Sequence, residues 1–106
     1  MSAASEVLVI GLGSPDAGDD AVGPLVADAV ARLALGGVRV LAHEDPTDLP
    51  LLWAGLPRVV VVDAVRSGAS PGSVEAVDAA ASAPPPDGRG THDFGLASAI
   101  GLSRAL

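Results

Sequence analysis

The segment from Val7 to Gly23 constrains the fold more strongly than any other part of the chain. It opens with an uninterrupted apolar run rich in β-branched side chains, which is typical of a strand covered on both faces of a sheet. A turn containing Gly11, Gly13 and Gly18 follows, and glycines let the backbone turn tightly and let other atoms approach closely. The segment therefore predicts a buried strand that leads into a helix at the sheet edge where α/β folds bind ligands.

Three aspartates, Asp16, Asp19 and Asp20, occupy this turn. The turn begins like the glycine fingerprint of dinucleotide-binding domains. However, Asp16 stands where that fingerprint needs its third glycine, and three carboxylates would repel a pyrophosphate. Carboxylates at this density suit a cation better. Turn formation and helix capping are the simpler roles, and we favour them for Asp16 and Asp19.

The residues after the turn predict a helix and then a second strand. Apolar side chains recur at helical spacing over residues 22–33, with Pro24 in the first turn, where its missing N–H costs nothing. Asp20 therefore precedes or caps this helix. Gly36 and Gly37 are predicted to end it, and residues 38–42 are predicted to form the strand.

A polar cluster, residues 43–48, lies directly after the second predicted strand. Residues 49–54 beyond it predict a short helix, with Thr47 or Asp48 as its cap.

Four consecutive valines, residues 59–62, predict a central parallel strand buried on both faces. Asp63 follows directly, and a carboxylate leaving a buried strand is costly to desolvate unless it is hydrogen-bonded, paired or metal-bound. If this strand and the first are parallel neighbours, Asp63 lies at the same sheet edge as Asp20. Capping of the following loop is the alternative role, and we favour the functional one.

The last third of the chain predicts a strand, an irregular segment and a helix. Residues 73–78 alternate between polar and apolar, and the connection before them is too short for a helical crossover, so we expect a strand antiparallel to the third. Three prolines at 84–86 exclude regular structure in the segment that follows. That segment ends at His92, directly before a helix predicted over residues 94–106. A lone histidine in a loop is usually incidental, but one that follows a long irregular segment and opens a helix is better placed for chemistry.

Composition agrees with one folded domain over residues 1–106. Hydrophobic residues make up 49% of the chain and charged residues 18%, which is a globular balance and not a disordered one. The elements predict an α/β fold of three α/β/α layers, with a mostly parallel twisted sheet and one antiparallel strand.

Charge and residue content exclude several classes of function. The formal net charge of −7 argues against nucleic acid and anionic membranes as partners. The chain has no cysteine, which rules out disulfides, thiolate metal sites and cysteine nucleophiles. No signal-peptide pattern and no membrane-length apolar stretch are present, so we expect a soluble, cytoplasmic protein.

Three groups of residues, in this order and spacing, resemble the motifs of the hydrogenase maturation proteases. These enzymes are nickel-dependent endopeptidases that trim the large subunit of nickel–iron hydrogenases. The matching pieces are Gly-Leu-Gly-Ser (11–14) with Gly-Asp-Asp-Ala-Val-Gly-Pro (18–24), Val-Asp-Ala-Val (62–65) with Ser-Gly (67–68) and Pro-Gly (71–72), and Thr-His-Asp-Phe-Gly-Leu-Ala (91–97).

The resemblance implies that Asp20, Asp63 and His92 form the metal-recognition site and carry the catalytic function. Family members recognise nickel already placed in the precursor of the large subunit and then remove its C-terminal extension. Two carboxylates and a neutral imidazole suit a divalent transition metal. Three protein ligands also leave coordination positions open for substrate groups or water.

The chain departs from the family pattern in three ways. Ser14 replaces the usual asparagine and Ala21 the usual glycine, and both changes leave the ligand set intact. Family members also continue for a further strand and helix, so the resemblance implies a chain that is truncated at its C-terminus. We then expect the strand over 59–62 to keep one unpaired edge, which favours self-association, and protease activity to be low.

Two other functions are also compatible with the sequence. One is a truncated, non-catalytic member of the same family that binds metal or the hydrogenase precursor. The other is an unrelated nucleotide-binding α/β domain, which Asp16 and the acidic turn disfavour.

Overall fold

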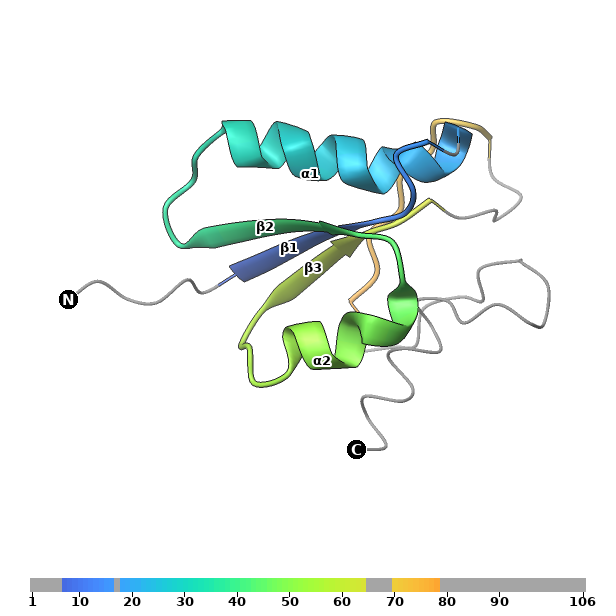
Figure 1. The fold of residues 1–106 in the computed structure, drawn as a ribbon. Helices are drawn as coiled ribbons and strands as arrows, with labels where there is room; N and C mark the ends of the chain where they lie inside the picture. Colours follow the sequence, from blue (N-terminus) through green and yellow to red (C-terminus); the bar gives the residue numbers. More distant parts are fainter. Residues whose placement is uncertain (1–6, 17, 65–69, 79–106) are drawn as a thin grey trace.

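The computed structural model describes residues 7–16, 18–64 and 70–78 of the chain (Figure 1). Strands and helices alternate along the described part of the chain, and a short 3₁₀ helix precedes each α-helix. The elements are β1 (Val7–Leu12), η1 (Gly18–Ala21), α1 (Val22–Arg32), β2 (Val38–His43), η2 (Pro46–Asp48), α2 (Leu49–Trp53) and β3 (Val59–Val62).

The three strands form one parallel sheet in the order β2-β1-β3. The prediction that the first and third strands are parallel neighbours is therefore confirmed. The prediction that the valine strand is central is wrong for the described residues, because β3 pairs there only with β1 and Val60 is 49% exposed. The predicted burial on both faces is not found either, because no residue of β3 is fully buried. A run of valines favours a strand, but it fixes neither how well the strand is covered nor how many strands lie beside it.

The two α-helices lie on opposite faces of the sheet (Figure 1). Side chains of β1 alternate between these faces, as the pleat of a strand requires. Leu8, Ile10 and Leu12 form a buried cluster with Leu49 of α2. Gly11, on the other face, lies against α1.

The contact between β1 and α1 depends on two glycines. A Cβ atom placed on Gly11 would lie 2.7 Å from the Cβ of Ala27 and closer still to the carbonyl group of Gly23. Conversely, a Cβ atom on Gly23 would lie 2.7 Å from the backbone nitrogen of Leu12. The close approach expected at Gly11 is therefore confirmed, and it is backbone against backbone.

Helix α1 ends earlier than the glycine pair predicts. Its last residue is Arg32, and Ala34 has φ of 51°, the left-handed conformation that stops a helix. Gly37, with φ of 75°, instead turns the chain into β2. Pro24 does lie in the first turn of α1, and the residue at the helix N-cap is Ala21, without a side-chain hydrogen bond. Asp20 therefore precedes the helix, in η1.

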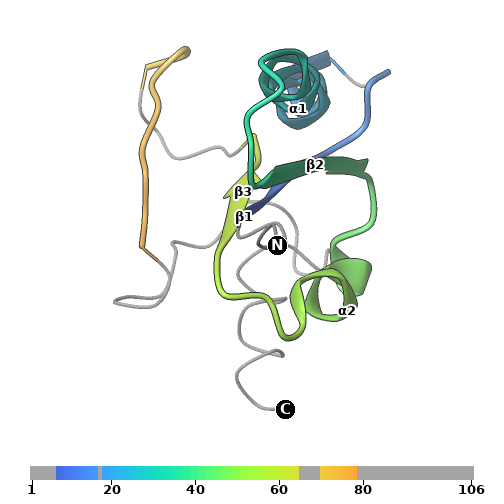
Figure 2. The same cartoon turned by 90° about the vertical axis from the view of Figure 1, so that its left-hand side faces the viewer.

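The predicted antiparallel strand is absent from the described residues. Residues 73–78 form no ladder with a described strand, and all of them are exposed. Figure 2 shows this segment running apart from the sheet. Alternation of polar and apolar side chains is not sufficient for a strand, because the backbone groups also need a neighbouring strand to bond with. The predicted proline-rich segment and the helix over 94–106 lie outside the described residues.

Candidate functional site at the carboxyl edge of the sheet

The parallel pairing of β1 and β3 brings two of the predicted acidic segments to one edge of the sheet. Gly11 pairs with Val62, the last residue of β3, and Asp63 follows immediately. The turn that carries Asp20 leaves β1 at the same carboxyl end, and η1 lies on that side of the molecule (Figure 1). This is the edge at which open α/β sheets bind ligands.

The structure describes the predicted ligands to different extents. Asp63 is partly buried and makes an interaction of its own. Asp20 lies within η1, but its side chain is outside the described part of the structure. His92 lies outside the described residues altogether. Convergence of the three side chains on one metal therefore stays a prediction.

A cleft of about 500 Å³ lies at the same carboxyl edge, between the ends of β1 and β2. It arises where β1 leads into α1 on one face of the sheet while β2 leads into α2 on the other (Figure 1). The backbone N–H of Gly13 donates to the carbonyl oxygen of His43 at 3.0 Å, which holds the two loops together at its base. The cleft is lined by Gly13, Pro15, Pro24, Ala42, His43, Glu44, Asp45 and Asp48.

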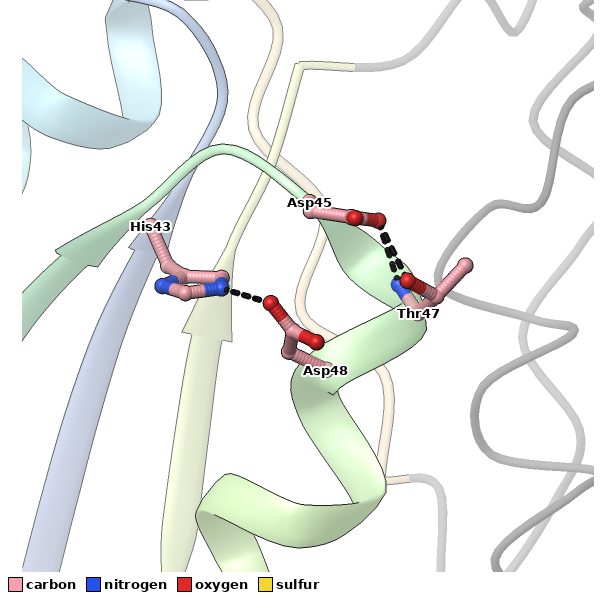
Figure 3. A network of polar contacts seen from close by, with 4 residues as sticks. All are labelled: His43, Asp45, Thr47 and Asp48. Atoms are coloured by element: carbon pink, nitrogen blue, oxygen red, sulfur yellow. Dashed lines mark hydrogen bonds and ion pairs between the residues drawn. The ribbon is translucent and has the colours of Figure 1, made fainter.

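The side chains of His43 and Asp48 are hydrogen-bonded to one another at this cleft. The His43 Nε2 atom lies 2.8 Å from the Asp48 Oδ2 atom, and both side chains are partly buried (Figure 3). An ionised carboxylate only accepts hydrogen bonds. The proton therefore lies on Nε2 of His43, and in the neutral ring Nδ1 is left as an acceptor.

Asp45 shapes the turn that connects His43 to Asp48. Its Oδ1 atom accepts from the Thr47 backbone N–H at 2.9 Å and from the Thr47 hydroxyl at 2.6 Å (Figure 3). The hydroxyl bond and then the backbone bond hold the pKa of Asp45 below its usual value. Asp45 is thus the residue that caps η2 with its side chain. Asp48 is the N-cap residue of α2, as one of the two predicted alternatives has it, but its side chain makes no cap hydrogen bond and points to His43 instead.

The sequence indicates a polar cluster at residues 43–48, but it does not reveal the hydrogen bond between His43 and Asp48 within that cluster. His43 and Asp48 are five residues apart, a separation that matches no regular helical or strand spacing. The extended backbone at the end of β2 followed by the turn of η2 brings them together. The available signal was the position of the cluster, directly past the carboxyl end of a parallel strand.

The described side chains do not assemble a metal site by themselves. Among them, no three histidine, aspartate or glutamate residues come close enough together to hold one ion. A site built on Asp63 would need ligands from residues beyond this set, as the prediction with Asp20 and His92 supposes. Within the same part of the chain, no helix is long and apolar enough to cross a bilayer.

Comparison with models of protein families, with curated proteins and with solved structures found no significant match to this chain. A functional proposal for this chain therefore rests on its residues and their geometry. They establish a small α/β fold with a parallel sheet and an acidic carboxyl edge.

Proposed function

We propose that this chain is an endopeptidase that matures nickel–iron hydrogenases, removing the C-terminal extension of the nickel-loaded large-subunit precursor. The observation that supports this most is the parallel pairing of β1 with β3, which places Asp63 and the turn carrying Asp20 at one sheet edge. The three motifs on which the resemblance rests supply the rest of the site. The full domain is then a three-layer α/β/α fold that acts in the cytoplasm, where the precursor is made.

In this proposal, the nickel of the precursor is recognised by three side chains, those of Asp20, Asp63 and His92. Nickel belongs to the precursor and not to the protease, and the two carboxylates and the imidazole would contact it there. Such oxygen and nitrogen donors are suitable for a divalent transition metal. A precursor without nickel would lack this contact and would not be held with its scissile bond at the sheet edge.

The decisive experiment is to incubate the chain with a nickel-loaded precursor and with the same precursor free of nickel. The mass of the large subunit is then measured. We expect loss of the C-terminal extension only from the nickel-loaded form. A precursor that binds to the chain but keeps its mass would support the alternative that the chain is a non-catalytic member of the family. A precursor that is neither bound nor shortened would contradict both.

Variants assign the roles. Asp20→Ala, Asp63→Ala and His92→Ala are each expected to abolish processing while changing the unfolding free energy by no more than about 1 kcal/mol. The matched control is Asp28→Ala, which removes an exposed carboxylate of α1 that pairs at 3.0 Å with Arg32. It is expected to process precursor at the parent rate. Parent rates in all three ligand variants would show that these residues are not the site.

A further inference from the structure

The register of the sheet places His43 and Asp63 on one line across the carboxyl edge. Leu12 pairs with His43 in β2, and Gly11 pairs with Val62 in β3. Asp63, one residue further, is therefore level with Leu12. His43 and Asp63 thus flank Leu12 on either side, separated by two interstrand spacings, or about 10 Å.

These two residues also share a face of the sheet. Leu12 packs into the core cluster with Leu49 of α2, and residues at one level of a parallel sheet point to the same face. The bond from His43 to Asp48, at the start of α2, agrees with this placement. His43 also lines the cleft, and Figure 3 shows its second ring nitrogen directed away from Asp48.

We propose that His43 is the general base of the peptide hydrolysis and that Asp48 is its positioning residue; this inference rests on the proposed function. The Asp48 carboxylate accepts from Nε2, which fixes the tautomer and leaves Nδ1 to accept a proton. A substrate whose metal is recognised at Asp63 would place its scissile bond beside the cleft that His43 lines. In hydrolases, a histidine base is commonly oriented by a carboxylate that is hydrogen-bonded to one ring nitrogen, while the other ring nitrogen takes the proton.

The proposed hydrolysis of the peptide bond consumes one water molecule and needs no oxidant or reductant. A water oxygen attacks the scissile carbonyl carbon, forming a C–O bond, while His43 Nδ1 takes a proton from that water. The C–N bond then breaks, and the imidazolium returns the proton to the leaving amine. The products are a new C-terminal carboxyl group and the free amine of the released extension. Asp48 stabilises the imidazolium between these two events.

Carboxylates surround the imidazole on the β2–α2 side. Glu44, Asp45 and Asp48 line the same cleft, and Asp63 is level with His43 at the end of β3. The described residues that line the cleft from β1, its loop and α1 are Gly13, Pro15 and Pro24, none of which carries a charge. The charged groups that line the cleft therefore all lie on its β2–α2 side.

The test measures kcat and KM for nickel-loaded precursor as a function of pH. His43→Gln is expected to lower kcat by about 10²- to 10⁴-fold with little change in KM, and to abolish the dependence of kcat on imidazole deprotonation. Asp48→Asn is expected to lower kcat as well, because the ring loses the carboxylate that fixes its tautomer and orientation. Asp28→Asn, on the exposed surface of α1, serves as the control for loss of a carboxylate. Parent kcat and an unchanged pH profile in His43→Gln would overturn the inference while leaving the proposed function intact.

A second measurement does not depend on activity. Nitrogen NMR of the imidazole rings reports which ring nitrogen carries the proton, and with two histidines in the chain the His43→Gln variant assigns the signals. The neutral ring of His43 is expected to be protonated at Nε2, and protonation at Nδ1 would overturn the inference. A parent chain that leaves nickel-loaded precursor intact would overturn the proposed function, and the role of His43 with it.

Discussion

At the residue scale, the Asp45 carboxylate shows how one short loop sets a protonation state. Two donors from a single residue, the hydroxyl and the backbone N–H of Thr47, converge on one oxygen of Asp45. Both bonds favour the charged form, so the pKa of Asp45 is lowered from 3.8 in the folded chain. Because the pKa is lower in the folded state than in the unfolded one, the stabilisation is present above about pH 4 and is lost as the pH falls through the folded value.

We therefore predict that Thr47→Val raises the pKa of Asp45 toward its ordinary value. Valine keeps the shape of threonine but removes the hydroxyl, which is the larger cause of the shift. Thr47→Ser keeps the hydroxyl and is the control. Titration of the carboxyl carbon by NMR measures the pKa in each chain. An Asp45 titration in Thr47→Val that coincides with the parent curve would show that the hydroxyl bond is not the cause.

At the scale of elements, the crossing of α1 over β1 depends on the absence of two side chains. Gly11 and Gly23 let the two backbones meet, and Ala27 is the small residue that the crossing also requires. This contact sets the path by which α1 leaves the acidic turn. It therefore also positions Pro24, at the start of α1, as one wall of the cleft.

Gly23→Ala is expected to lower the unfolding free energy by about 3 kcal/mol, since its Cβ atom would overlap the Leu12 backbone, which cannot rotate away. The loss is a large fraction of a typical domain stability of roughly 5–15 kcal/mol. Gly36→Ala is the matched control, because a Cβ atom there meets nothing within 4 Å. Urea unfolding of the three chains gives the comparison. Equal losses in the two variants would mean that the crossing is looser than the structure shows.

At the scale of the whole molecule, β3 is an outer strand of the sheet that the described residues form. Within the described part of the chain, β3 pairs only with β1, and its four residues are all valine. Natural edge strands generally carry a charge, a proline or a bulge that blocks pairing with another chain. We therefore expect a second copy to pair along β3, against the general repulsion of a net charge of −7.

Val60→Lys should shift the chain toward the monomer, because Val60 is 49% exposed on this strand and a charge there opposes edge pairing. Leu25→Lys makes the same change in net charge at an α1 residue that is 66% exposed, and it should leave the association of the parent unchanged. Light scattering across a concentration series at fixed salt measures the mass of each. A parent chain that stays monomeric throughout would refute edge pairing.

Sequence alone determined the features that depend on local periodicity and on residue type. The three strands, the long helix with Pro24 in its first turn, the acidic turn and the place of Asp63 directly after a strand all follow from patterns within a few residues. Only the tertiary structure decided which described strand is central, which residues of the cluster after β2 bond to one another, and that residues 73–78 pair with none of the described strands. Each of these depends on neighbours that are distant in the chain or on a turn that brings irregularly spaced residues together. Strand order depends on the side to which each helical crossover returns the chain, and the pairing of His43 with Asp48 depends on where β2 stops and η2 begins.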